Sequence, residues 1–244
     1  MNIQIEVHSH TNICQHAYST ILESVQCAKE LGLRGVAITD HGPQCFDGAS
    51  LTYFHNMDLV SREMYGVRII KGVEANILNR KGEIDIPPDV LQVLEWVIAS
   101  IHTPDFKADD FDACTSAYLG VLENPYVDML GHTGRGNYCY DHEKVIKRAV
   151  ERNKVIEFNE HTFDVGADAA KRCLAIANVC KKQGAFVCLG SDAHFAGAVG
   201  KTPRAALLLK EVDYPKERIL NLNADRFFEY LAQKKTKLKS EEER

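Results

Sequence analysis

Short apolar runs alternate along the chain with longer amphipathic stretches. The short runs are rich in Val and Ile and stop at polar residues, a pattern typical of buried strands. Seven runs have this character, at residues 3–10, 35–41, 67–75, 96–102, 127–132, 154–161 and 185–194.

The stretches between these runs have the apolar spacing of helices. They cover residues 20–33, 49–66, 109–124, 141–153 and 166–184. In the first of them, Thr20 and Glu23 have the spacing of a capping box, and Gly32 marks the end. Strand–helix units that repeat about every 30 residues predict an α/β fold in which right-handed crossovers join parallel strands.

Two segments depart from this alternation. Residues 74–88 read as a small hairpin with a turn near Lys81 and Gly82, closed by a Pro-Pro break. Residues 233–244 are charged and aperiodic, which predicts a disordered tail. We therefore expect residues 1–232 to form a single barrel domain.

Composition narrows the class of protein. The length of 244 residues suits one sizeable domain, and the formal net charge of -5 argues against a broad basic face for nucleic acid. The start of the chain lacks the pattern of a signal peptide, and no apolar run is long enough to span a bilayer. The eight cysteines form no C-x-x-C pair, so we expect free thiols in a cytoplasmic protein; the helical spacing of Cys173 and Cys180 predicts a buried face.

Histidines and acidic residues gather where the predicted strands end. In a β/α barrel the carboxyl ends of all strands converge on one face, so residues far apart in sequence meet there. Six different strands contribute such residues, a coincidence that isolated structural histidines do not explain. The candidate metal ligands are His8, His10, His16, His41, Glu74, His102, His132, Asp192 and His194.

Their spacing favours metal binding. Residues two apart in a strand point the same way, so His8 with His10, and Asp192 with His194, can each hold one ion. Imidazole and carboxylate are common ligands of zinc and also suit iron or manganese. Since a catalytic zinc takes about three protein ligands, nine candidates predict three ions, or two ions with additional orienting residues. Glu74 can bridge, because a carboxylate has two oxygens.

Six short motifs occur in order along the chain: "HSHT", "ITDHG", "GVEANI", "IH" at 101–102, "GH" at 131–132 and "GSDAH". This set resembles the polymerase and histidinol phosphatase (PHP) superfamily, and the resemblance runs from about residue 3 to residue 225. The "HAYST" and "GEIDI" segments are most similar to its bacterial phosphatase branch with a trinuclear zinc site. The resemblance implies a distorted (βα)7 TIM-like barrel, a di- or trinuclear metal site and hydrolysis of phosphate esters. We expect three divalent ions, with Zn²⁺ first and Mn²⁺ or Fe²⁺ as alternatives.

The resemblance also implies a grouping of the ligands. The first ion would be held by His8, His10, Glu74 and Asp192, the second by Glu74, His102 and His132, and the third by His16, His41 and His194. Adjacent ions would lower the pKa of a shared water, so that hydroxide attacks the phosphorus of a phosphomonoester.

Other residues are candidates for supporting roles. Arg135, three residues after His132, is the preferred phosphate ligand, with Arg204 and Lys201 as second choices. We expect Asp40 to orient an imidazole or to take part in proton transfer.

Residues near the sixth strand are candidates for the margin of the site. His161 is a candidate for the rim of the pocket, and Glu157 and Asn159 could orient ligands. His55 and His142 lie in helical stretches, and we expect neither to bind metal.

Three alternatives stay open. A phosphodiesterase or exonuclease could act on short oligonucleotides, although no stable nucleic-acid complex or membrane partner is expected. An amidohydrolase-type barrel also uses H-x-H, but it would be expected to have eight strands and a lysine after the fourth, where this chain has His102. A metal-storing module is the third possibility. The favoured partner is a small phosphorylated substrate.

Overall fold

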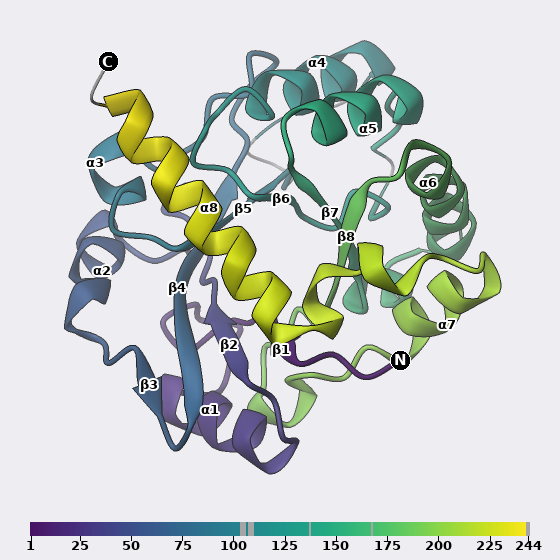
Figure 1. Cartoon of the computed structure of the whole chain (residues 1–244). Helices are drawn as coiled ribbons and strands as arrows, with labels where there is room; N and C mark the ends of the chain where they lie inside the picture. Colours follow the sequence, from purple (N-terminus) through teal and green to yellow (C-terminus); the bar gives the residue numbers. More distant parts are fainter. Residues whose placement is uncertain (103–105, 107–109, 137, 167, 243–244) are drawn as a thin grey trace.

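The computed structural model describes residues 1–102, 106, 110–136, 138–166 and 168–242. Seven parallel strands form a nearly closed barrel, in the order β1-β2-β4-β5-β6-β7-β8, and the short β3 pairs antiparallel with β4 (Figure 1). The strands are β1 Ile5–Glu6, β2 Gly35–Ile38, β3 Glu63–Met64, β4 Val67–Asn76, β5 Trp96–Ser100, β6 Met129–Leu130, β7 Val155–Asn159 and β8 Phe186–Gly190.

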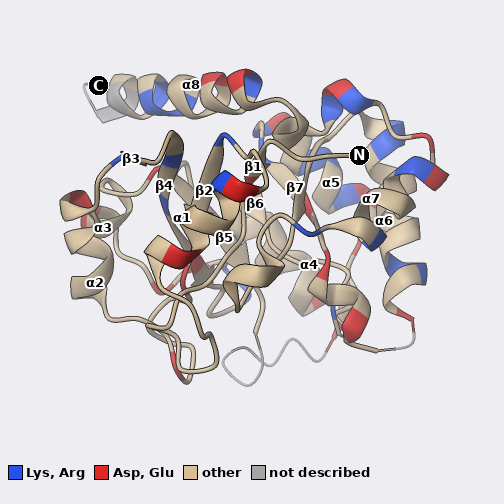
Figure 2. Cartoon of the chain, turned by 90° about the horizontal axis from the view of Figure 1, so that it is seen from below, with Lys and Arg blue, Asp and Glu red and all other residues tan. Residues whose placement is uncertain are grey.

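Helices surround the barrel, and α8 crosses one end of it (Figures 1 and 2). The α-helices are α1 Ile21–Glu30, α2 Leu51–His55, α3 Pro88–Leu91, α4 Phe111–Val121, α5 His142–Glu151, α6 Ala169–Gln183, α7 Pro203–Glu211 and α8 Ala224–Glu242. Short 3-10 turns are η1 Asn56–Leu59, η2 His161–Asp164, η3 Ala196–Ala198, η4 Lys216–Arg218 and η5 Leu220–Leu222. In the described residues no helix is both long and apolar enough to cross a membrane.

Alternate residues of each strand face the barrel interior and the helices. In β5, Val97 and Ala99 pack in the cluster under the helices, whereas Trp96 and Ile98 pack inside the barrel. The inward Ser100 comes next, and its hydroxyl donates to Glu74 at 2.6 Å. The interior therefore changes from apolar to polar along the strand direction.

Helix α8 closes the apolar end of the barrel. Phe227 is fully buried, and its ring centroid lies 5.0 Å from that of Trp96. Tyr230 also contacts Trp96, with centroids 6.1 Å apart. Because Trp96 begins β5, α8 covers the amino ends of the strands and leaves the carboxyl ends open.

The barrel closes between β1 and β8 mainly through side chains. One backbone bridge joins Ser9 to Ala193 at the carboxyl end. Below it, the buried amide of Asn221 donates to the carbonyl oxygens of Ile5 (2.9 Å) and Leu189 (2.7 Å). Asn221 thus links the two strands where a ladder is missing.

Glu6 makes a second link at this seam. Its carboxylate accepts hydrogen bonds from the backbone N–H groups of His8 (3.0 Å), Ser191 (3.2 Å) and Gly200 (2.7 Å), and burial raises the pKa of Glu6. Glu6 therefore fixes the ends of β1 and β8 relative to each other.

The seven predicted strands and the capping box of α1 are confirmed. The hairpin at 74–88 is present as an Ile77–Ile84 antiparallel bridge, with Gly82 at φ +76°. The helical face of Cys173 and Cys180 is buried, and the eight cysteines, all within the described residues, form no disulfide.

The prediction of one helix over 49–66 is wrong. Helix α2 stops at His55, and β3 then pairs Met64 with Val67 of β4. Tyr65 (φ 55°) and Gly66 (φ 79°) make the two-residue turn, which matches the twist of a hairpin. The helical spacing of apolar residues over 49–66 gives no sign of such a turn.

The prediction of a disordered tail over 233–244 is wrong for residues 233–242, which are helical because they continue α8, and residues 243–244 lie outside the described residues. Lys234 gives the physical reason, since its ammonium lies 2.5 Å from the buried carboxylate of Asp128. This tertiary contact extends the helix beyond its apolar half.

Candidate metal centre

The nine candidate ligands lie together at the open, carboxyl end of the barrel, around the buried carboxylate of Glu74. Glu74 Oε2 lies 3.3 Å from His8 Nε2, 3.5 Å from His10 Nε2 and 2.8 Å from His41 Nδ1. The other oxygen, Oε1, lies 3.4 Å from His102 Nε2 and 2.7 Å from His132 Nε2. The two oxygens of one carboxylate thus face two separate sets of imidazoles.

Asp192 supplies a second buried carboxylate. Its Oδ1 lies 3.5 Å from His8 Nε2 and 3.1 Å from His10 Nε2. The same oxygen is 3.6 Å from His194 Nδ1. Asp192 and Glu74 therefore approach the His8–His10 pair together.

Three further imidazoles lie toward the mouth. The ring of His16 is 4.4 Å from that of His194 and 5.3 Å from that of His41, centroid to centroid. Donor atoms of His10, His41 and His194 lie within 4.8 Å of one another, as do those of His41, Glu74 and His102. Such spacing allows several metal ions to be held side by side.

The pattern of unpartnered atoms fits metal binding. Within the described residues, the buried side-chain nitrogens and oxygens that lack a hydrogen-bond partner are concentrated in this cluster. They include atoms of His8, His10, His41, His102, His194, Glu74 and Asp192. Buried polar atoms are normally satisfied, so their convergence at one point suits a set of cations.

The pKa shifts of the buried histidines also fit metal binding. Burial opposes a charged imidazole at His8, but the neighbouring Glu157, Glu74 and Asp192 outweigh it and raise the pKa of His8 well above its usual value. These carboxylates therefore attract positive charge. Burial lowers the pKa of His10 well below its usual value and that of His102 to about 4, which favours the neutral imidazole that metals bind.

Hydrogen bonds orient several of these rings. Glu157 Oε1 lies 2.7 Å from His8 Nδ1, and Glu157 Oε2 accepts from the backbone N–H of His132 at 2.7 Å. Asn76 Oδ1 lies 2.6 Å from His102 Nδ1, and Asp47 Oδ2 pairs with His16 Nδ1. Such partners fix the ring nitrogen that remains for a metal.

Sequence reasoning missed Asn76 and Asp47. Asn76 carried a usable signal, because it lies two residues after Glu74 on the same face of β4. Asp47 lies in a loop, where no periodicity relates it to His16.

Two of the candidate ligands have a rare backbone conformation. His132 has φ 28° and Asp192 has φ 54°, a region that costs non-glycine residues roughly 1–3 kcal/mol. The surrounding hydrogen bonds hold these residues there, which is typical of functional positions.

A family model of the PHP domain matches residues 6–242. The chain belongs to the PHP domain family. A protein of Clostridium botulinum named probable phosphatase is 39% identical over 234 residues, which cover 96% of both chains. A protein of Acetivibrio thermocellus with the same name is 39% identical over 239 residues, which cover 98% of this chain and 99% of the relative.

Two solved structures share the fold of this PHP domain. Histidinol phosphate phosphatase from Lactococcus lactis, complexed with Zn, L-histidinol and phosphate, has a TM-score of 0.62 and 16% identity and covers 87% of this chain and 94% of its own. A chain of archaeal ribonuclease P with mature tRNA has a TM-score of 0.57 and 14% identity and covers 94% of this chain and 90% of its own. At these identities the likeness is one of fold.

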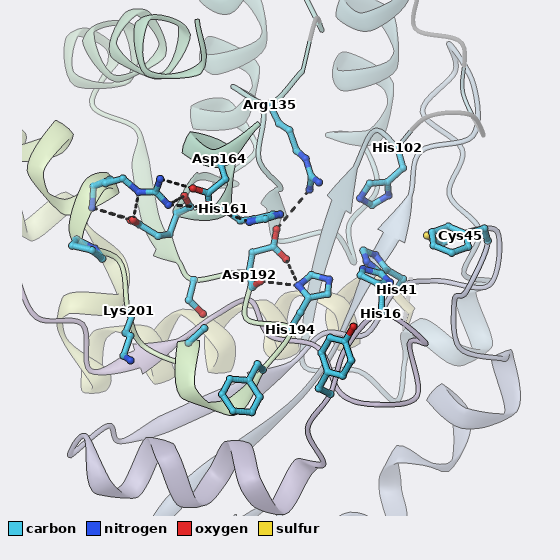
Figure 3. Close-up of a pocket in the computed structure, with 18 residues that line it drawn as sticks. His16, His41, Cys45, His102, Arg135, His161, Asp164, Asp192, His194 and Lys201 are labelled. Atoms are coloured by element: carbon cyan, nitrogen blue, oxygen red, sulfur yellow. Dashed lines mark hydrogen bonds and ion pairs between the residues drawn. The ribbon is translucent and has the colours of Figure 1, made fainter. Parts of the chain in front are cut away.

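The cluster of candidate ligands opens into a cavity of about 720 Å³. His16, His41, His102, Asp192 and His194 line it (Figure 3). The other four candidates are buried and are not part of the cavity lining. A volume of roughly 300–1,000 Å³ is typical of small-molecule sites.

Three predicted cations reach this cavity, with different partners. Arg135 points toward Asp192, with Nη1 3.7 Å from Oδ2 (Figure 3). Lys201 also lines the cavity. The guanidinium of Arg204 is engaged by Glu160 at 2.6 Å and Asp164 at 2.6 Å, so it orders the rim and is a weaker candidate for substrate binding.

Asp40 is buried beside the centre and orders the first loop. It accepts hydrogen bonds from the backbone N–H of Thr11 (2.6 Å) and the hydroxyl of Tyr53 (2.7 Å), and from Cys14 Sγ (3.5 Å). The predicted imidazole partner is not among the hydrogen bonds of the described residues. A part in proton transfer stays a prediction.

The remaining candidates lie at the margin or outside. His161 lines the cavity and pairs with Asp164 at 3.2 Å. Asn159 accepts from the backbone N–H of Thr162 and, among the described contacts, does not orient a ligand. His55 and His142 lie in α2 and α5, away from the cluster.

Proposed function

We propose that this PHP domain is a metal-dependent phosphatase that hydrolyses phosphomonoesters at a trinuclear zinc centre. The observation that carries the proposal is the convergence of seven imidazoles and two carboxylates, with unpartnered buried atoms, at the base of an open cavity. The names of the relatives, probable phosphatase, support it, as does the bound Zn and phosphate of the Lactococcus lactis neighbour.

The two oxygens of Glu74, which face different imidazoles, support the first two groups implied by the resemblance. His8, His10 and Asp192 with Glu74 Oε2 would hold the first ion, and His102 and His132 with Glu74 Oε1 the second. His16, His41 and His194 would hold the third. Zinc bound there would supply Lewis acidity, which activates water and offsets charge on phosphoryl oxygens.

The protein would contribute orientation and a cation. Glu157, Asn76 and Asp47 hold the ring nitrogens of His8, His102 and His16 in place through the contacts described above. Arg135 would bind phosphoryl oxygens, because a guanidinium offers two parallel N–H donors to a phosphate.

Phosphate release tests this function. Protein loaded with Zn²⁺ should release phosphate from a panel of phosphomonoesters, lose the activity on chelation and recover it when Zn²⁺ is restored. Parallel digestion of 3′- and 5′-labelled oligonucleotides and hydrolysis of amides and lactones test the alternatives. Turnover of those substrates with no phosphate released from any monoester would overturn the proposal.

Arg135→Ala tests the phosphate contact. We expect KM for phosphomonoesters to rise about tenfold or more, because a charge-assisted contact is lost, while the metal content stays unchanged. Arg226→Ala is the control, since Arg226 donates to Glu217 on the far side of the chain. Equal KM in Arg135→Ala and wild type would refute this assignment.

A further inference from the structure

Three large aromatic side chains at the mouth of the cavity are exposed to solvent. Tyr18 is 76% exposed, Phe46 82% and Phe195 60%, and all three line the cavity above the metal centre. Single exposed apolar residues are ordinary, but a group of them around a concave site marks a place where ligands bind.

The three rings come from three adjacent loops. These loops follow β1, β2 and β8; β1 pairs with β2, and the Ser9–Ala193 bridge joins the end of β1 to the end of β8. The backbone N–H of Tyr18 donates to the carbonyl of His194 at 2.8 Å, which joins the first loop to the loop of Phe195. The backbone N–H of His16 donates to Asp47 at 3.2 Å, which joins the first loop to that of Phe46.

The rest of the rim has a different chemistry. Arg135, His161 and Asp164 come from the loops after β6 and β7 and lie together along another part of the cavity (Figure 3). The cavity therefore has one aromatic wall and one polar wall, with the metal centre at its base.

We propose that the aromatic wall, Tyr18, Phe46 and Phe195, selects phosphomonoesters whose alcohol carries a flat aromatic ring. This inference rests on the proposed function and names its class of substrate. The phosphoryl group would face the metal centre and Arg135, and the ring of the alcohol would stack on the exposed rings above them. Stacking of this kind tolerates different ring types, because every aromatic ring has a π face.

The shape of the site favours a small molecule as the occupant. The three rings line a hollow of about 720 Å³ rather than a convex patch, and this volume matches that of small-ligand sites. The anionic end of a monoester is complementary to Arg135 and to the metal ions that the cluster would hold, which a purely apolar ligand would leave unpaired.

A matched substrate series tests the proposal. The probes are 2-phenylethyl, 2-cyclohexylethyl and n-butyl phosphate, whose alcohols are all primary alkanols and therefore similar leaving groups. In the wild type, kcat/KM should be about tenfold higher for 2-phenylethyl phosphate than for the other two substrates. This factor lies within the range of about 5- to 150-fold expected for stacking on one ring. The double variant Phe46→Leu with Phe195→Leu should lose this preference, so that its kcat/KM values for the three substrates become similar.

Two controls separate stacking from other effects. Phe46→Trp with Phe195→Tyr should restore the preference, and Leu59→Ala, at an exposed position in η1, should not alter it. Equal kcat/KM for the three substrates in wild type, or a parallel change for all three in the Leu variant, would overturn the proposal.

Binding of phosphonates distinguishes this failure from failure of the proposed function. 2-Phenylethylphosphonate and n-butylphosphonate cannot be hydrolysed and share the same anionic group, so the difference between their affinities in calorimetric titration reports the wall. Tighter binding of the phenyl compound, lost in the Leu variant, supports the aromatic wall even if no ester is hydrolysed. Equal binding of both would overturn it.

Discussion

The two ends of the barrel use the same strands for opposite purposes. At the amino end the inward residues of β4 and β5 are Ile70, Trp96 and Ile98, which pack under α8. At the carboxyl end of the same strands they are Glu74 and Ser100. The difference shows that stability and chemistry are separated along the strand axis, as in other β/α barrels.

The carboxyl end is arranged at a cost to stability. It collects unpartnered buried polar atoms and two non-glycine residues with positive φ, His132 and Asp192. The amino end is close-packed and apolar, with Phe227 fully buried. Substitutions at the two ends should therefore separate activity from stability.

Glu74→Gln should have the largest effect on activity. It keeps the volume of the side chain but removes the charge shared by both sets of imidazoles, so kcat should fall about a thousandfold, the upper range for loss of one electrostatic group. The Tm of the metal-free protein should not fall. Phosphate release measures kcat and thermal melts measure Tm. The control is Glu83→Gln, at an exposed position of the hairpin. Retained activity would contradict a bridging role.

Phe227→Ala should have the opposite profile. Loss of a fully buried aromatic ring typically costs about 3–5 kcal/mol of the free energy of unfolding. Urea unfolding should show this loss, whereas kcat below the new melting temperature should be unchanged. Phe228 is the half-buried neighbour of Phe227, and Phe228→Ala should lower the free energy of unfolding by less. A large fall in kcat for folded Phe227→Ala would mean that the two ends are coupled.

Glu157→Gln probes the support of the centre. The carboxylate orients His8 and the backbone of His132, and loss of such a partner typically costs about 10- to 100-fold in metal affinity or activity. Zinc titration against a chelating indicator measures the affinity. Glu151→Gln, at an exposed site on α5, serves as control. Unchanged affinity and activity would exclude this role.

Glu23→Gln should have the smallest effect, with a defined pH dependence. Hydrogen bonds from Thr20 lower the pKa of Glu23, so its stabilising contribution is present above the ordinary glutamate pKa, about 4.3, and is lost as the pH falls through the lowered value. The Tm difference from wild type should therefore be present at neutral pH and vanish in acid. A difference independent of pH would argue against the capping box.

Much of the fold was predictable because strand and helix periods are local properties. The seven strands and the Thr20 cap follow from them directly. Residues 49–66 were not predictable, because the Tyr65-Gly66 turn depends on pairing with β4. The helical state of 233–242 depends on the contact of Lys234 with Asp128, which is 106 residues away in sequence.

The candidate ligands were predictable because strand ends converge in any barrel of this type. The residues that hydrogen-bond to these ligands were harder to predict from the sequence. Glu157 lies in a strand and was found, whereas the pairing of Asp47 with His16 depends on how two loops fold. The engagement of Arg204 by Glu160 and Asp164 likewise comes only from tertiary structure.

The most direct test of the account is the metal content of the folded protein. After loading with Zn²⁺ and dialysis, elemental analysis of the wild type should give about three ions per chain, and His16→Ala should give about two, because only the group near the mouth is weakened. Circular dichroism should show that both are folded. A wild type that binds one ion or none, or equal content in the two proteins, would contradict the trinuclear centre.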